Sequence, residues 1–339
     1  MYDSYTQPES GIISNTNKNR ERFIMQKKDI SFSLIIATMN RLETLIQTFA
    51  ELEKTSVVPN EIIILDQSTE SAVINGIKRL SMSTKFHIRY YHLDYPSLTH
   101  ARNVGLQYAK NDILIYMDDD VSVETDTFRN VCKIMEDETI ALIGGLDSST
   151  EKGKNPFGYF FGFKSHFRKN LGGYVTSAMY GRYRSGFTGW AKTEWAMGYF
   201  FVIRKSLAER WDLEWDERFI LYGYPEDLDF SYRYAKKAES EGLECILDPT
   251  VSVVHRVSQE WRETKKAVTY MKIVNREYLT YKFGWSFFSR MVTRWSNFGL
   301  LIQRCIHRDR PMDVIKAQLF CDKYRSDIKK GILHTELYT

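Results

Sequence analysis

Short apolar runs alternate with amphipathic stretches through the first part of the chain. The run Ser33–Ala37 is followed by helical spacing of apolar residues from Arg41 to Lys54, and a second apolar run follows at Glu61–Leu65. A strand, a helix and a strand in such close succession form a βαβ unit, which builds a parallel sheet with right-handed crossovers. The sequence therefore predicts an α/β fold, with a mostly parallel central sheet flanked by helices.

The alternation continues to Gly145 and then stops. Residues 146–194 are rich in Gly, Phe, Tyr, Trp and Ser and have no clear period. Two interpretations stay open for them: a functional excursion beside an acceptor molecule, or a pair of β-hairpins that complete the core. The further predicted strands are His87–His92, Ile113–Met117, Ile140–Gly145, Met197–Arg204, Glu244–Leu247 and Thr250–Val254. The further predicted helices are Thr99–Lys110, Asp126–Met135, Lys205–Trp211 and Asp227–Glu241.

The chain divides into three parts by composition. Residues 1–28 are a polar, flexible tail, 29–258 hold the α/β domain, and 259–339 have an amphipathic helical pattern. The last part contains sixteen Lys plus Arg against eight Asp plus Glu, whereas the whole chain has a net charge of +4. Such a basic, aromatic-rich region suits an anionic membrane surface; a solvated helical face or a homodimer interface is the alternative.

The sequence also bears on location. The N-terminal tail has no apolar signal core, and no apolar run is long enough to span a bilayer. The four cysteines are scattered without ligand spacing, which suits a reducing compartment. We expect a cytoplasmic protein, peripheral on the inner face of the plasma membrane where its basic region binds lipid.

Polar side chains follow several predicted strands. Thr38, Asn40 and Arg41 follow the first strand, Asp66 follows the second, and the run Asp118–Asp120 follows the strand Ile113–Met117. Ligands of open parallel sheets bind beyond the carboxyl ends of the strands. We therefore expect these side chains to share one rim.

The run Asp118–Asp120 is the most informative motif. Three adjacent carboxylates repel one another, and a hard divalent cation relieves this repulsion. Mg²⁺ typically binds through one or two carboxylates together with substrate phosphates. The placement after a buried strand favours a metal site over an acidic loop that caps the next helix.

Asp66 and Arg102 are candidate nucleotide contacts. A carboxylate at a strand tip can accept the ring N–H of a uracil or thymine, or a ribose hydroxyl. The alternative for Asp66 is an ordinary turn residue. Arg102 lies near the start of a helix whose N-terminal amides suit an anion, so it can bind a base or a phosphate; a plain surface arginine is its alternative.

Glu226 and Asp227 open another predicted helix. Acidic residues there complement the helix dipole, which explains them structurally, but a carboxylate at a rigid helix start can also act as a general base. His255 follows the apolar strand Val251–Val254. For this histidine, a structural role and a contact to a metal or a diphosphate both stay open.

Taken in order, these motifs resemble the family-two inverting glycosyltransferases. The resemblance spans about residues 31–258 and implies the GT-A (Rossmann-like) fold with a C-terminal helical extension. It implies transfer of one sugar from a UDP- or dTDP-linked donor to a hydroxyl of a glycan or lipid-linked glycan, as in bacterial surface polysaccharide synthesis. The segments that carry it are Leu34–Arg41, Glu61–Ser68, His100–Gly105, Asp118–Asp120 and Glu226–Asp227.

The resemblance also implies roles for individual residues. Asp227 would be the catalytic base, and Asp120 and His255 would bind Mg²⁺ or Mn²⁺. The acceptor side would include Trp195, Gly198 and Glu226. The residues around the nucleotide sugar would be Thr38, Asn40, Arg41, Asp66, Arg102, Asp118 and Asp119.

Some features depart from the family pattern. Asp119 makes the middle of the Asp-x-Asp motif acidic, and Pro225 stands where the family commonly has a glycine before Glu-Asp. The Gln-x-x-Arg-Trp signature of processive synthases and their transmembrane helices are absent from the sequence. Transfer of a single sugar is therefore expected rather than polymerisation.

Other functions fit the sequence less well. A sugar nucleotidyltransferase would carry a glycine-rich phosphate loop near the first strand, and Thr38–Arg41 has no glycine. A phosphorylated receiver domain would be shorter. A non-catalytic sugar-binding module could use Trp190 and Trp195 but would leave the aspartates without a purpose. No nucleic-acid partner is expected, and the identity of the sugar stays open.

Overall fold

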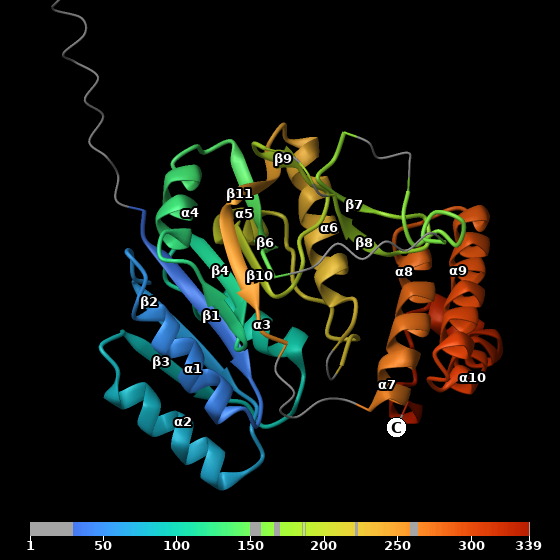
Figure 1. Cartoon of the computed structure of the whole chain (residues 1–339), viewed down its shortest axis with the longest axis horizontal. Coiled ribbons are helices and arrows are strands. Elements are labelled where there is room, and N and C mark those ends of the chain that lie inside the picture. Colours follow the sequence, from blue (N-terminus) through green and yellow to red (C-terminus); the bar gives the residue numbers. More distant parts are fainter. Residues whose placement is uncertain are drawn as a thin grey trace, which may run out of the picture.

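The computed structural model describes residues 30–149, 157–165, 170–184, 186, 188–220, 223–257 and 264–338. Within them, a central sheet of nine strands has helices on both faces, and a group of helices from the end of the chain lies beside it (Figure 1). The predicted α/β class is confirmed. The tail predicted at residues 1–28 lies outside the described residues.

Most strands of the central sheet run in one direction. β10 is antiparallel to both of its neighbours, and β5 and β9 are antiparallel to β11, whereas the other pairings are parallel. The carboxyl ends of β1, β2, β4 and β11 therefore reach the same edge of the sheet. The spatial order is β3 (Ile88–His92), β2 (Glu61–Asp66), β1 (Phe32–Thr38), β4 (Ile113–Asp118), β10 (Phe200–Arg204), β6 (Ile140–Asp147), β11 (Glu244–His255) and β5 (Val121–Val123), with β9 (Ala191–Lys192) paired to β11.

Both faces of the sheet are covered because successive side chains of a strand point to opposite faces. In β1, Leu34 and Ile36 belong to the core beneath α1, α2 and α4, whereas Ile35 belongs to the core beneath α3, α5 and α6. Burial on both faces explains why these strands are continuous apolar runs in the sequence. The helices are α1 (Leu42–Leu52), α2 (Ser71–Ser83), α3 (Leu98–Tyr108), α4 (Thr127–Met135), α5 (Lys205–Arg210) and α6 (Glu226–Ser240).

Some elements differ from the sequence prediction. α2 was not predicted, because its buried residues are only Gly76 and Ile77, too few to produce an apolar stripe. The two strands predicted after residue 243 form one strand, β11, whose pairing to β6 shifts between Leu247 and Ser252. The described part of residues 146–194 favours the hairpin interpretation, since β7 (Gly173–Val175) and β8 (Gly181–Tyr183) pair antiparallel.

The described part of the C-terminal region is helical, as predicted. α7 continues into a π-helical turn, η1, and then into α8 without interruption. None of the described helices is long and apolar enough to cross a membrane. The elements are α7 (Lys265–Tyr270), η1 (Met271–Asn275), α8 (Arg276–Lys282), α9 (Phe287–Ile306), α10 (Pro311–Lys323), α11 (Arg325–Lys329) and a short 3₁₀ turn, η2 (Thr335–Leu337).

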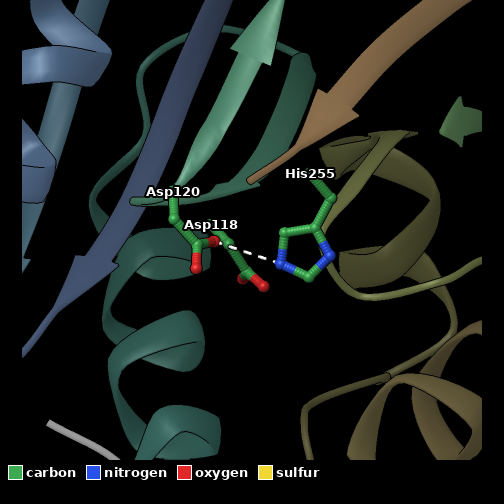
Figure 2. Close-up of side chains that lie close together, drawn as sticks. All are labelled: Asp118, Asp120 and His255. Carbon is green, nitrogen blue, oxygen red and sulfur yellow. Dashed lines mark ion pairs between the residues drawn. The ribbon is translucent and has the colours of Figure 1, made fainter. Parts of the chain in front are cut away.

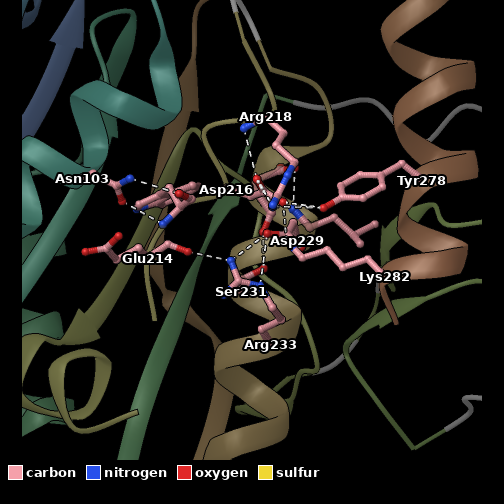
Figure 3. Close-up of polar contacts among 12 residues, drawn as sticks. Asn103, Glu214, Asp216, Arg218, Asp229, Ser231, Arg233, Tyr278 and Lys282 are labelled. Carbon is pink, nitrogen blue, oxygen red and sulfur yellow. Dashed lines mark hydrogen bonds and ion pairs between the residues drawn. The ribbon is translucent and has the colours of Figure 1, made fainter. Parts of the chain in front are cut away.

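A buried ionic network joins these helices to the sheet domain. Lys282 Nζ, at the end of α8, lies 2.7 Å from Asp216 and 2.6 Å from Asp229, which is fully buried on α6. Tyr278 donates its hydroxyl to Asp216 at 2.9 Å, and Arg233 pairs with Asp229 at 2.7 Å. Figure 3 shows the two carboxylates between cations from both parts of the chain. The C-terminal helices are therefore anchored to the domain by charge as well as by apolar packing.

Candidate active site

Asp118, Asp120 and His255 meet at the carboxyl edge of the sheet. Asp118 ends β4 and His255 ends β11, and the short strand β5, which follows Asp120, pairs with β11 so that Val121 lies opposite His255. This pairing brings Asp120 Oδ1 to 3.1 Å from His255 Nε2 (Figure 2). One ligand atom from each of the three residues lies within 4.8 Å of the others.

These three residues fit a divalent cation. Their donors are two carboxylates and one imidazole, a set that suits Mg²⁺ or Mn²⁺ with further positions for phosphate oxygens. Buried surroundings raise the pKa of Asp118, although the charge of Arg102 opposes the increase. Burial lowers the pKa of His255, but its hydrogen bond to Asp120 and the nearby carboxylates raise it overall. A bound cation would relieve this crowding of negative charge.

Asp119 is turned away from this cluster. It accepts a hydrogen bond from Thr38 Oγ1 at 2.7 Å and pairs with Arg41, whose guanidinium also reaches Asp120 at 3.3 Å. Burial raises the pKa of Asp119 to about 7, against the charge of Arg41 and the Thr38 hydrogen bond. Thr38, Arg41 and Asp119, all predicted around the nucleotide, thus hold the aspartate turn in shape.

Asn40 and Asp66 form the next part of the rim. Asn40 has a left-handed backbone, with φ 53°, and its amide N–H donates to Ser68 Oγ at 2.8 Å, which ties the ends of β1 and β2 together. Asp66 is fully buried and accepts hydrogen bonds from Ser68 N–H at 2.9 Å and from the Tyr90 hydroxyl at 2.7 Å. A base that bonds to Asp66 would therefore share or replace the Tyr90 hydrogen bond.

Arg102 links the metal cluster to the Glu-Asp motif. It is 3% exposed, and its guanidinium donates to Glu226 Oε1 at 2.9 Å, to Asp118 Oδ1 at 3.2 Å and to the main-chain oxygen of Gly198 at 3.0 Å. It also lies 4.5 Å from the ring centre of Trp215. These contacts hold Arg102 as a bridge between two carboxylates, rather than as a surface arginine.

Glu226 and Asp227 have different environments on the first turn of α6. Asp227 accepts hydrogen bonds from the N–H groups of Gly198 at 2.9 Å and Leu228 at 2.7 Å. Burial raises the pKa of Asp227 despite these bonds. Burial and the neighbouring Asp227 raise the pKa of Glu226 to about 8, although Arg102 lowers it. In the described part of the chain, no cation pairs directly with Asp227, whose raised pKa suits a carboxylate that accepts a proton.

Gly198 is fitted tightly beside both carboxylates. A Cβ at this position would lie 3.1 Å from Asp227 Cβ, 3.2 Å from Arg102 Nη2 and 3.4 Å from Glu226 Oε1. A side chain at position 198 would thus crowd Asp227, Arg102 and Glu226, which explains why a glycine stands at this predicted site position. Trp195 is different, since it is 4% exposed and donates its indole N–H to the main-chain oxygen of Arg182 at 3.3 Å. The Trp195 ring is therefore buried against β8, and it could affect an acceptor only indirectly, by holding β8 in position.

Two aromatic residues of the site were not predicted. Trp215 lies against Arg102, and the Tyr199 ring centre lies 5.2 Å from that of His255. Tyr199 also donates its hydroxyl to the main-chain oxygen of Gly145 at 3.1 Å. Trp215 comes from a segment without a motif, whereas Tyr199 lies in the predicted strand Met197–Arg204, next to Gly198. No local pattern distinguishes either ring as part of the site.

The mixed sheet, with its antiparallel β10 and a cluster of ligand side chains at its carboxyl edge, has the GT-A fold. The chain belongs to glycosyl transferase family 2, which residues 33–211, just over half of the chain, match. A search of curated proteins found no match.

Two solved structures share the fold. GalNAc-T7 with UDP, GalNAc and Mn²⁺ is 18% identical with a TM-score of 0.57, covering 75% of this chain and 48% of that one. This chain thus spans about half the length of GalNAc-T7. The mannosyltransferase PcManGT from Pyrobaculum calidifontis, in complex with GDP-Man and Mn²⁺, is 14% identical with a TM-score of 0.50, covering 90% of this chain and 86% of that one.

Proposed function

We propose that this protein transfers one sugar from a nucleotide diphosphate sugar to a hydroxyl of a glycan or lipid-linked glycan, with inversion at the anomeric carbon. Membership of glycosyl transferase family 2 supports glycosyl transfer. The observation that carries the proposal is the Arg102 bridge, which joins the cluster of Asp118, Asp120 and His255 to the Glu226–Asp227 pair. One buried network thus holds a metal-binding end and a proton-accepting end in a fixed relation.

The donor belongs at the metal-binding end. Asp118, Asp120 and His255 would hold Mg²⁺ or Mn²⁺, which supplies positive charge against the departing nucleotide diphosphate. The Mn²⁺ and nucleotides bound in GalNAc-T7 and in PcManGT support this arrangement. Asp66, at the neighbouring strand tip, would bond to the base of a UDP- or dTDP-linked sugar. Arg41, paired with Asp119 and Asp120, keeps the turn in place while phosphate oxygens approach.

The acceptor belongs at the Asp227 end. The two main-chain N–H groups that donate to Asp227 fix the direction of its carboxylate. Asp227 removes the proton of the acceptor hydroxyl as that oxygen attacks the anomeric carbon on the side opposite the diphosphate. The carbon–oxygen bond to the diphosphate breaks as the new bond forms, so a single displacement inverts the configuration.

A donor panel tests the proposal. The full chain is incubated with Mn²⁺, with UDP-, dTDP- and GDP-linked sugars and with glycan and lipid-linked glycan acceptors, and release of nucleoside diphosphate is followed. We expect release from one nucleotide class, lost in EDTA and in Asp120→Ala, and retained in the exposed control variant Asp94→Asn. Release that continues in Asp120→Ala or EDTA contradicts the metal role, and absence of release from every donor contradicts the proposed function.

A lipid-linked acceptor would place α9 at a membrane surface. One face of α9 exposes large apolar side chains, which we call the α9 stripe: Phe287, Phe288, Met291, Trp295 and Phe298. Trp295 donates its indole N–H to the main-chain oxygen of Phe160, whose own ring is also exposed. Aromatic side chains on a basic helical region bind anionic lipid interfaces.

Co-sedimentation with vesicles tests the α9 stripe. We expect binding to phosphatidylglycerol vesicles, weaker in high salt, and lost when Phe287 and Phe288 are both changed to Glu. Changing the exposed Lys85 and Lys133 of the sheet domain to Glu is the control for added negative charge. Loss of self-association in the stripe variant, without any lipid binding by the wild type, would identify a dimer interface and contradict the membrane role.

A further inference from the structure

Three cations from neighbouring elements lie together without a carboxylate partner among the described residues: Arg182 on β8, Lys272 on η1 and Arg276 on α8. The guanidinium groups of Arg182 and Arg276 lie 4.8 Å and 4.0 Å from the same Tyr180 ring centre. Lys272 Nζ lies 5.6 Å from the ring centre of Tyr224. We call these three residues the Lys272 cluster.

Arg276 shows how unusual the cluster is. Its side chain is fully buried, and its hydrogen bonds go to neutral acceptors: the main-chain oxygens of Ala178 and Lys272, Ser296 Oγ and Asn297 Oδ1. Arg182 likewise donates to the main-chain oxygens of Phe163 and Gly181, at 2.8 Å and 2.9 Å. Hydrogen bonds to neutral groups satisfy the N–H donors but do not balance the charges.

Lys272 is the member of the cluster whose charged group has no hydrogen-bond acceptor among the described residues. Within the described residues the ammonium group of Lys272 has no hydrogen bond or ion pair, and its contact is with the face of the Tyr224 ring. Burial lowers the pKa of Lys272, and the positive charges of Arg304, Arg276 and Arg182 lower it further. Arg304 is the exception among these neighbours, because it pairs with Asp309. The fold thus concentrates positive charge around Lys272 that nothing in the described part of the chain neutralises.

The position of the cluster connects it to the proposed acceptor end. Asn275, in the same π-helical turn as Lys272, donates its side-chain amide to the main-chain oxygen of Tyr224 at 2.6 Å. Tyr224 precedes Pro225, Glu226 and Asp227 directly in the chain. π-Helical turns widen a helix locally and occur frequently at functional sites.

We infer that the Lys272 cluster binds a phosphate group carried by the acceptor, next to the hydroxyl that Asp227 deprotonates. The inference rests on the proposed function for its acceptor, and names that acceptor as a phosphate ester. The donor diphosphate is a separate ligand, assigned to the metal cluster on the far side of the Arg102 bridge. Arg182 and Lys272 would supply charge-assisted hydrogen bonds, and buried Arg276 adds positive charge from behind.

Phosphate-dependent thermal stability tests the site without turnover. A ligand that binds only the folded state raises the melting temperature with its concentration. The probe is inorganic phosphate without divalent metal, where the bare carboxylates of Asp118 and Asp120 repel it, compared with sodium chloride of equal ionic strength. We expect phosphate to stabilise the wild type beyond chloride. In Lys272→Met we expect at least about tenfold weaker phosphate binding, the loss typical of one charge-assisted hydrogen bond.

The matched control is Lys316→Met, on the exposed face of α10, which should respond to phosphate as the wild type does. Equal effects of phosphate and chloride on the wild type would overturn the inference, as would an undiminished phosphate effect in Lys272→Met. Weaker binding of UDP with Mn²⁺ in Lys272→Met would overturn it too, because the cluster would then serve the donor.

Transfer assays then identify the source of the phosphate. A polyol phosphate and a short-chain polyprenyl phosphate sugar are compared as acceptors with their dephosphorylated forms. In Lys272→Met, the KM for the preferred phosphorylated acceptor is expected to rise, while the affinity for the donor stays unchanged. Phosphate binding without transfer from any donor would refute the proposed function and leave the anion site standing. Transfer that prefers neither phosphorylated acceptor would refute the inference and leave the proposed function standing.

Discussion

Adjacent aspartates in one turn have different partners in this structure. Asp118 contacts Arg102, Asp119 contacts Thr38 and Arg41, and Asp120 contacts His255 and the other end of the Arg41 guanidinium. Three carboxylates that would repel one another in isolation thus have different sets of cations and donors, with Arg41 shared between Asp119 and Asp120. The acidic middle residue of the motif, which departs from the family pattern, is accommodated by Arg41.

Asp227→Asn separates the roles of this carboxylate. The main-chain N–H groups of Gly198 and Leu228 donate to different oxygens of Asp227, and asparagine keeps only one of these two oxygens. One hydrogen bond is therefore lost, and the free energy of unfolding should fall by about 1 kcal/mol. Loss of a positioned base should reduce turnover by about 10²- to 10⁴-fold. Donor binding by calorimetry should stay close to that of the wild type and of Asp94→Asn. Unchanged turnover would assign the base to another residue.

Glu226 gives the fold a pH dependence. Its pKa is raised from 4.5 to about 8 in the folded protein, so the folded state keeps a proton that the unfolded chain loses. The contribution of Glu226 to stability is therefore complete below about pH 4.5 and is lost as the pH rises toward about 8. The melting temperature of the wild type should fall more steeply across this range than that of Glu226→Gln. Parallel curves for the two proteins would contradict the raised pKa.

At the scale of elements, the approach of β10 to the start of α6 sets the active-site geometry. Gly198→Ala adds a methyl group within 3.1 Å of Asp227 Cβ and 3.2 Å of Arg102 Nη2. We expect a loss of about 1–3 kcal/mol in the free energy of unfolding from overpacking, and about 10²-fold lower turnover from displacement of Asp227. Gly189→Ala is the control, because no atom lies within 4 Å of its Cβ position. Equal turnover in both variants would show that this spacing is not required.

At the scale of the whole molecule, Lys282 holds the C-terminal helices against the sheet domain. Lys282→Met leaves Asp216 with Arg218 and Tyr278, and Asp229 with Arg233, so the loss is partial. We expect the free energy of unfolding to fall by about 3 kcal/mol, as for other broken buried pairs, measured by urea denaturation beside Lys316→Met. Trypsin should also release the C-terminal helices faster. Equal stability of the two variants would show that apolar packing alone anchors them.

The long strands of the sheet could be predicted from the sequence, because runs such as Ile113–Met117 are apolar throughout and are buried on both faces. The short strands β5, β7, β8 and β9 were not predicted one by one. β2, β4 and β11 run in the same direction, which brings Asp66, Asp118 and His255 to one edge, so the fold class and this shared edge were predictable. The roles proposed for individual site residues stay predictions.

Tertiary structure decided the rest. α2 escaped prediction because little of it is buried, and Arg102 finds its partners on β4, α6 and the segment before β10. The Lys272 cluster likewise collects residues from β8, η1 and α8. No local pattern encodes such encounters, because side chains far apart in the sequence are brought together only when the two cores and the C-terminal helices pack.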